Sequence, residues 1–199
     1  MNIWFATSNM HKKKELERIL GSSLKIPSDE GIIFNPEESG ASFCDNALIK
    51  ARELQKLLGR NEPVIADDSG LCVDALNGRP GILSARYGME NGRKLTANEQ
   101  NTLLLYELGD TQKRSARFVC AMVLLLSTER FYLVQETIEG EITGKNGIRG
   151  EGGFGYDPVF LVKGTGRTLA EHSEEEKNTI SHRAKAGKII SNILKNEKK

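Results

Sequence analysis

The chain has 199 residues, with 28 Lys or Arg against 27 Asp or Glu, so its formal net charge at pH 7 is only +1. This length fits one domain, or two closely joined lobes, with a substantial core. The balanced charge gives no sign of nucleic acid or an acidic membrane surface as a partner.

The three cysteines are far apart and lack the close pairs of a zinc site or a disulfide framework, so free thiols in a reducing compartment are expected. No apolar run approaches the roughly 18 residues of a membrane span. The first basic residues follow the short apolar segment at the start of the sequence, the reverse of the order in a secretory signal. We therefore expect a soluble cytoplasmic protein without a membrane partner.

The first half of the chain alternates short apolar runs with helical patterns. Residues 2–6 (NIWFA) predict a strand that ends in a turn, and a helix is expected after it. Another strand is expected at 32–34. Apolar residues recur every three or four positions over 43–58, which predicts an amphipathic helix that stops at Gly59. Residues 63–67 predict the next strand.

The second half of the chain contains a run of strands. A helix is expected at 95–108, and the continuously apolar residues 116–126 predict a central strand that is covered on both faces. Residues 131–138 predict its antiparallel partner, a glycine-rich loop follows, and a final helix is expected over 180–194. This order of elements predicts an α/β protein with a mixed central β-sheet flanked by helices.

The turn before the first helix brings together groups that suit phosphate. Helix N-termini carry partial positive charge and favour acidic residues, yet TSNMHKKK places basic residues in the opening turns. Backbone N–H groups, the hydroxyls of Thr7 and Ser8, the Asn9 amide and a lysine would converge there. The glycine spacing of a Walker or dinucleotide loop is absent. The alternative is a solvated basic helix capped by Ser8 or Asn9.

Adjacent carboxylates occur at Glu37–Glu38 in a polar loop and at Asp67–Asp68 at the end of a predicted strand. Neighbouring side chains on a strand face opposite sides, so the two aspartates should have different roles. One carboxylate from each pair could bind Mg²⁺, with water and substrate phosphate as further ligands. A carboxylate beside the metal could orient or deprotonate an attacking water. The alternative is a turn cap at one aspartate and surface charges at the two glutamates.

The segment GEGGFGYDPVF has the composition of a recognition loop. It offers Phe154 and Tyr156 as stacking surfaces and Asp157 as a hydrogen-bond acceptor. Glycine allows the backbone of such a loop to approach a ligand closely. An ordinary glycine-rich turn is the alternative.

The segment TISHRAKA places His182 and Arg183 at the start of a helix, with Thr179 or Ser181 as the expected cap. A capped helix without a ligand is the alternative. The three histidines of the chain lack the spacing of zinc ligands, and no Gly-x-Ser-x-Gly elbow occurs.

Five segments between about residue 5 and residue 187 carry these features in order: FATSNMHKKKEL, PEESGASFCDNALIKA, ADDSGLCVDALNGRPGILSARYG, GGFGYDPVF and EEEKNTISHRAKA. Together they resemble the Ham1/RdgB family of inosine triphosphate pyrophosphatases, whose Maf-like fold is elongated, with two lobes around a central cleft. The resemblance implies one such domain over residues 1–199, usually in a homodimer. It also implies Mg²⁺-dependent attack of water at the α-phosphorus of ITP, dITP or XTP, which releases pyrophosphate and a nucleoside monophosphate.

The resemblance also implies roles for individual residues. Asp68 would be the general base and, with Glu37, a ligand of Mg²⁺. The residues implied to bind the substrate are Thr7, Ser8, Asn9, Met10, His11, Lys12, Lys50, Ser69, Phe154, Gly155, Tyr156, Asp157, Lys177, His182 and Arg183. His11 stands where many members of the family have glycine. Asp67 is expected to support the site by holding the loop or a neighbouring lysine.

Two alternatives to this enzyme are open at the level of sequence. One is a pyrophosphatase of the related Maf type that acts on other modified nucleotides; it would share the opening strand, turn and helix, but GGFGYDP with SHR is not expected there. The other is a nucleotide-binding regulator that has lost catalysis. The presence of both Glu37 and Asp68 argues against that regulator.

Overall fold

The computed structural model describes residues 3–59 and 62–197, and the chain divides into two compact units. Unit 1 comprises Met1–Asp68, Cys120–Glu136 and Ser181–Lys199, and unit 2 comprises Ser69–Val119 and Thr137–Ile180. Five strands form one sheet in the order β1-β2-β3-β4-β5. Their bounds are β1 Trp4–Phe5, β2 Val64–Val73, β3 Ser115–Ser127, β4 Arg130–Ile142 and β5 Phe160–Val162.

The sheet is mixed, as predicted. Strand β1 is parallel to β2, with Trp4 opposite Val64, and β4 is antiparallel to β5. Strands β3 and β4 are neighbours joined by only Thr128 and Glu129, and so short a connection requires an antiparallel hairpin. The strand predicted at 116–126 is the central one, and its apolar side chains are buried from Ala116 to Leu125 with only Arg117 half-buried.

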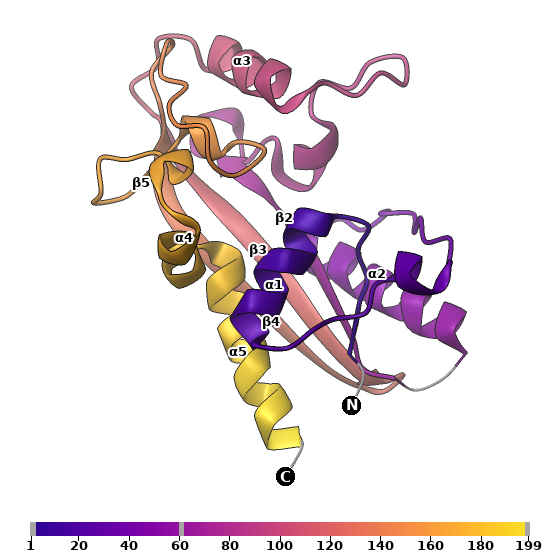
Figure 1. Cartoon of the computed structure of the whole chain (residues 1–199). Coiled ribbons are helices and arrows are strands. Elements are labelled where there is room, and N and C mark those ends of the chain that lie inside the picture. The colour runs from indigo at the N-terminus through magenta and orange to yellow at the C-terminus, as the bar shows by residue number, and fades with distance from the viewer. Residues whose placement is uncertain (1–2, 60–61, 198–199) are drawn as a thin grey trace. The chain divides into compact units, whose positions relative to one another are not determined.

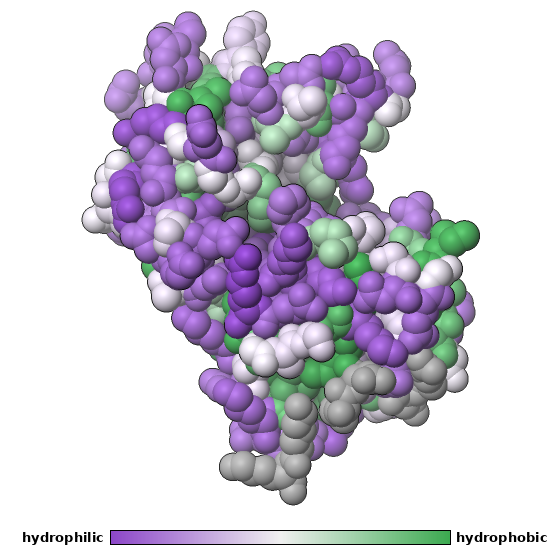
Figure 2. Space-filling model, in the orientation of Figure 1, coloured by the Kyte–Doolittle hydropathy of each residue, from purple (hydrophilic) through white to green (hydrophobic). Residues whose placement is uncertain are grey.

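The described residues of unit 1 form three α-helices: α1 Met10–Leu20, α2 Phe43–Leu58 and α5 His182–Glu197. Helices α1 and α5 lie side by side (Figure 1). Leu16 and Ile190 pack with Met122 in the core of this unit. A Cβ atom on Gly187 would lie 2.8 Å from Ile19, so glycine permits the close approach of the two helices. The outward surface over α1 is hydrophilic (Figure 2).

Unit 2 contains α3 Ala97–Leu108 and α4 Glu174–Ile180. Its apolar core includes Leu104, Phe118 and Phe160, and the two phenylalanine rings are 4.8 Å apart between centroids. The five 3₁₀ helices of the described chain are Pro27–Glu30, Asp74–Leu76, Gly81–Arg86, Asp157–Val159 and Leu169–Glu171.

Most predicted elements are confirmed, but the strand expected at 32–34 is wrong. The backbone of Lys25 pairs with β1 instead, through Phe5 N–H to Lys25 O at 2.7 Å. Leu24 and Ile26 are buried, whereas Ile33 is 91% exposed. Alternating burial around Lys25, not the apolar run at 32–34, therefore identifies the segment that continues the sheet.

Other boundaries differ by smaller amounts. The first strand is limited to Trp4–Phe5, and residue 2 of the prediction lies outside the described residues. Strand β5 and helix α4 were not expected, and the final helix begins at His182 and continues to Glu197. All three cysteines are free thiols, as expected. No helix in the described part of the chain has the length and hydropathy needed to cross a membrane.

Candidate active site

Asp67 lies at the centre of a buried ion-pair network in unit 1. Lys12 Nζ is 3.0 Å from its carboxylate, and Arg183 Nε donates to Asp67 Oδ2 at 3.2 Å. Arg183 is only 2% exposed and also donates through Nη1 to Glu15 Oε2 at 2.6 Å. Two helices and one strand thus bring their charged side chains to one point.

The cations of this network keep Asp67 ionised. Burial alone would raise the pKa of the carboxyl, but Lys12, Arg183 and Lys50 outweigh burial and hold that pKa well below its usual range. Burial likewise works against the charge of Arg183, yet Glu15 and Asp67 raise its pKa. Asp67 is therefore a fixed counterion, and the neighbouring lysine it was expected to hold is Lys12.

Asp68 faces a different set of groups. Its Oδ1 accepts a hydrogen bond from Lys50 Nζ at 2.8 Å, and its Oδ2 accepts one from Asn46 Nδ2 at 3.2 Å. Burial is the largest influence and raises the pKa of Asp68, although Lys50 opposes the shift. The adjacent aspartates therefore have different partners, as strand alternation predicted, and opposite pKa shifts.

Glu38, rather than Glu37, is the glutamate that lies near Asp68. Lys50 Nζ donates to Glu38 Oε1 at 2.9 Å, so one ammonium group bridges the carboxylates of Glu38 and Asp68. Glu37 is exposed. The sequence-based choice of Glu37 as the partner of Asp68 stays a prediction, and the contact with Lys50 favours Glu38.

The Glu38–Lys50–Asp68 arrangement is compatible with a magnesium ion. Both carboxylates already share a cation, the ammonium of Lys50. Within the described residues, no group of three or more Asp, Glu, His or Cys side chains forms a ready-made metal cage. Mg²⁺ commonly binds through one or two carboxylates and keeps water and substrate phosphates as its other ligands, so a site with two carboxylates fits this metal.

The predicted phosphate-binding turn is stabilised by Asn9. The Asn9 Oδ1 accepts hydrogen bonds from the N–H groups of His11 at 2.9 Å and Lys12 at 3.2 Å, so Asn9 is the cap of α1. Thr7 Oγ1 accepts a hydrogen bond from Asn9 N at 3.1 Å. Ser8, Met10 and His11 are exposed. Of the two caps considered from the sequence, Ser8 and Asn9, the structure has Asn9. The Lys12 side chain contacts Asp67, so this part of the basic helix is not simply exposed to solvent.

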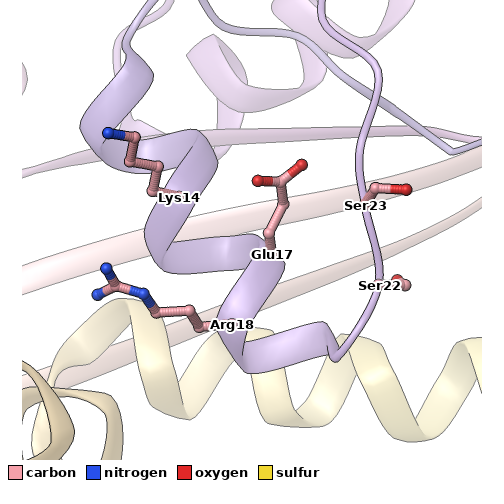
Figure 3. A pocket seen from close by; sticks show the side chains of 5 residues that line it. All are labelled: Lys14, Glu17, Arg18, Ser22 and Ser23. Carbon is pink, nitrogen blue, oxygen red and sulfur yellow. The ribbon is translucent and has the colours of Figure 1, made fainter.

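A surface hollow of about 460 Å³ lies on another face of α1 (Figure 3). Its lining residues are Lys14, Glu17, Arg18, Ser22 and Ser23. Lys14 and Arg18 come from consecutive turns of the helix, and Glu17 Oε1 accepts a hydrogen bond from Leu24 N at 2.9 Å. The lining contains none of the residues expected to bind substrate, so we place the candidate site elsewhere.

The start of α5 supplies the SHR residues. Ser181 Oγ accepts a hydrogen bond from Ala184 N at 3.0 Å, so Ser181 is the cap among the two predicted residues. His182 is buried, and burial, followed by the charge of Arg183, holds its pKa well below the usual value. His182 is therefore neutral at physiological pH.

The predicted recognition loop belongs to unit 2. Phe154 is 40% exposed, whereas Tyr156 is 4% exposed and packs in the core of the unit. The Tyr156 hydroxyl donates to the Ser84 carbonyl oxygen at 3.0 Å, and burial raises the pKa of Tyr156. Tyr156 is therefore an anchor of the loop, which corrects its prediction as a stacking surface, and Phe154 presents the accessible ring.

Asp157 and Lys177 complete this loop. Asp157 Oδ2 accepts hydrogen bonds from Phe154 N at 3.2 Å and from Lys177 Nζ at 3.1 Å. A Cβ atom on Gly153 would lie 2.0 Å from Asp157 Oδ2 and 2.3 Å from Lys177 Nζ, and the φ angle of Gly153 is +80°. Glycine is required there because any side chain would displace the ion pair.

The predicted residues are divided between the two units. Unit 1 contains Thr7, Ser8, Asn9, Met10, His11, Lys12, Glu37, Lys50, Asp68, His182 and Arg183, and unit 2 contains Ser69, Phe154, Gly155, Tyr156, Asp157 and Lys177. Sequence reasoning missed Glu15 and Asn46. Both could have been found from helical spacing, because Glu15 follows Lys12 by three positions and Asn46 precedes Lys50 by four.

The mixed sheet and the buried ion pairs of Lys12 with Asp67 and of Lys50 with Asp68 define an α/β protein with a buried cluster of charged side chains. The chain belongs to the Ham1 family, whose model matches residues 3–193.

Relatives cover almost the whole chain. It is 50% identical over 196 residues to a protein of Treponema denticola named dITP/XTP pyrophosphatase, with 98% of this chain and 99% of the relative aligned. It is 42% identical to the dITP/XTP pyrophosphatase of Bacillus subtilis, with 95% and 94% aligned. The solved structure of the Staphylococcus aureus Ham1 protein is similar with a TM-score of 0.86 at 38% identity, covering 99% of this chain and 100% of that one. These matches confirm the predicted family.

Proposed function

We propose that this chain hydrolyses noncanonical purine nucleoside triphosphates, namely ITP, dITP and XTP, to the monophosphate and pyrophosphate, and so removes deaminated purines from the nucleotide pool. The observation that carries the proposal is the pair of adjacent aspartates with different partners, Lys12 and Arg183 at Asp67 and Lys50 and Asn46 at Asp68, and with pKa shifts in opposite directions. Environments that separate the pKa values of two carboxyls are typical of sites that divide roles between them. The substrate class comes from the names of the relatives.

Asp68 is the proposed general base. It accepts a proton from the water whose oxygen forms a new bond to the α-phosphorus, while the bond from that phosphorus to the bridging oxygen breaks and pyrophosphate leaves. A carboxylate whose pKa is raised by burial accepts a proton more readily near neutral pH. Lys12 and Lys50 supply positive charge that can neutralise phosphate oxygens.

A magnesium ion is assigned in this proposal to the carboxylates of Asp68 and Glu38, which replaces Glu37 of the sequence prediction. When bound, Mg²⁺ would neutralise part of the triphosphate charge. The support is the ammonium of Lys50, which lies within 2.9 Å of both carboxylates and marks a position favourable to a cation. Asp67 stays ionised and holds Lys12 and Arg183 in place.

The loop with Phe154, Asp157 and Lys177 is proposed to recognise the base. Phe154 offers an exposed ring for stacking, and the Asp157–Lys177 pair offers an acceptor and a donor side by side. Hypoxanthine and xanthine present an acceptor at position 6 and a donor at N1, the reverse of adenine. A pocket matched to this pattern would leave buried groups unpaired with ATP, at about 1–3 kcal/mol for each mismatch.

A pyrophosphate-release panel tests the function. ITP, dITP, XTP, GTP, ATP and pyrimidine triphosphates are compared with and without Mg²⁺, and we expect turnover of the first three only, and only with metal. Equal turnover of GTP and ITP would overturn the specificity, and metal-independent turnover would overturn the role of Mg²⁺. Binding of ITP without pyrophosphate release would identify a regulator instead, and preference for modified pyrimidines would identify a Maf-type activity.

A homodimer made from one two-lobed domain per chain is part of the same proposal. Light scattering during gel filtration should give a mass near twice the 22.0 kDa of the chain. A mass equal to that of a single chain would contradict the dimer.

A further inference from the structure

A buried side chain of α3 holds the carbonyl group of Gly155. Asn101 is 2% exposed, and its Nδ2 donates to the Gly155 carbonyl oxygen at 3.1 Å. Gly155 has a φ angle of +63°, a backbone conformation that glycine adopts without strain. The hydrogen bond therefore fixes the orientation of one peptide group in the middle of the recognition loop.

This peptide group separates two aromatic side chains with opposite surroundings. Phe154 precedes it and is 40% exposed, whereas Tyr156 follows it and is buried with its hydroxyl on the Ser84 carbonyl. The chain must change direction at Gly155 to present one ring and bury the next. The C=O and N–H of a trans peptide point in opposite directions, so Asn101 fixes both sides of the turn.

The bonding of Asn101 is not explained by packing alone. Its Oδ1 is buried and has no hydrogen-bond partner among the residues that the structure describes. An unpaired buried acceptor lowers stability, so a core position without another role would favour an apolar side chain. The adjacent Gln100 differs, because its amide donates to the carbonyls of Ser84 and Tyr87 within the core of unit 2.

We propose that Asn101 is a positioning residue that holds the loop around Gly155 so that Phe154 is presented to the substrate base. The inference rests on the proposed function of this loop. Without the Asn101 hydrogen bond, the loop takes several conformations, and only a fraction of the molecules can bind the base. Apparent affinity falls in proportion to that fraction, while the chemical step at Asp68 is unaffected once the substrate is bound.

Two variants and one control test the proposal. Asn101→Ala removes the donor, and Asn101→Asp keeps the shape but places a carboxylate oxygen opposite the carbonyl. Leu108→Ala is the control, because it truncates a buried side chain of the same helix without removing the bond to Gly155. For each protein we would measure KM and kcat for ITP, the urea unfolding midpoint, and amide hydrogen exchange of residues 153–157 without ligand.

For both Asn101 variants we expect KM to rise about tenfold, the change that corresponds to loss of one hydrogen bond, with kcat within about twofold and exchange of the loop at least about tenfold faster. Leu108→Ala should lower the unfolding midpoint but leave KM and loop exchange unchanged. Unchanged loop exchange in Asn101→Ala, or the same KM increase in Leu108→Ala, would overturn the proposal. If the unmodified protein hydrolyses no triphosphate, the proposed function fails, and loop exchange still decides whether Asn101 positions the loop.

Discussion

The two groups of candidate site residues are held by different kinds of interaction. In unit 1, Asp67, Asp68 and Lys50 are fixed by ion pairs whose members are largely buried. In unit 2, the loop around Gly155 has one such ion pair, Asp157 with Lys177, and is also anchored by hydrogen bonds to backbone carbonyls from Asn101 and Tyr156. Ion pairs set local charge and pKa values, whereas hydrogen bonds to carbonyls set backbone shape. The difference indicates that the proposed phosphate chemistry depends on buried charge, whereas the proposed recognition of the base depends on the backbone conformation of a loop.

The largest effect should come from Asp68→Asn. The variant cannot accept a proton, so pyrophosphate release from ITP should fall about thousandfold. Circular dichroism should show an unchanged fold, because Lys50 keeps Glu38 as a partner. Activity within about tenfold of the unmodified protein would exclude Asp68 as the base.

Asp67→Asn should act on stability first. It leaves Lys12 and Arg183 largely buried without their shared counterion, so the free energy of unfolding should fall by about 3 kcal/mol. Urea unfolding measures this change. Glu30→Gln is the control, since its exposed pair with Lys25 should contribute less than about 1 kcal/mol. If the two variants lowered the free energy of unfolding equally, the buried Asp67 network would stabilise the protein no more than an exposed ion pair.

The pair Glu38→Gln and Glu37→Gln distinguishes the structural assignment from the sequence-based one. Only Glu38 shares Lys50 with Asp68, so its variant should raise the Mg²⁺ concentration for half-maximal activity about tenfold. The Glu37 variant should leave that concentration unchanged. The reverse result would restore Glu37 as the metal ligand.

In unit 2, Phe154→Ala and Tyr156→Phe should separate binding from stability. Loss of an exposed stacking ring should raise KM for ITP about tenfold. Tyr156→Phe removes only the hydroxyl bond to Ser84 O, so it should lower the free energy of unfolding by about 1 kcal/mol. A larger KM change for Tyr156→Phe than for Phe154→Ala would contradict the assignment of the exposed ring.

The smallest effect concerns the buried His182. Its folded pKa lies well below the usual 6.5, so the unfolded state binds more protons as pH falls below the ordinary histidine pKa, and stability is lost. Unfolding free energy should drop by about 1 kcal/mol between about pH 7.5 and about pH 5.5 from this residue. In His182→Asn the unfolding free energy should depend less on pH over this range. An unchanged pH dependence would exclude His182 as its source.

Much of the fold was predictable because its signals are local. Helix α2 has apolar side chains at regular spacing and a left-handed Gly59 at its end, and β3 is a continuous apolar run. The strand expected at 32–34 failed because Ile33 is apolar but exposed. The position beside β1 belongs to Lys25, which is selected by tertiary pairing rather than by local composition.

The sequence motifs predicted which residues belong to the candidate site, but not which of them contact one another. Strand alternation separated Asp67 from Asp68, yet their partners Arg183 and Asn46 come from distant segments. The contact of Glu38 with Lys50 depends on the geometry of a loop that has no periodic sequence pattern to reveal it. The burial of Tyr156 depends on the Ser84 carbonyl, which lies 72 residues earlier in the chain.

The adjacency of Asp67 and Asp68 makes the register of β2 part of the chemistry. Strand β2 is aligned against β1 with Trp4 opposite Val64 and Phe5 opposite Ile65. A slip of one residue would turn each aspartate to the opposite face of the sheet. One aspartate would then take the position of the other, and the second would move away from its own partners. A single-residue insertion or deletion in β2 before Asp67 would therefore be expected to abolish the proposed activity, although every proposed functional side chain would still be present in the sequence.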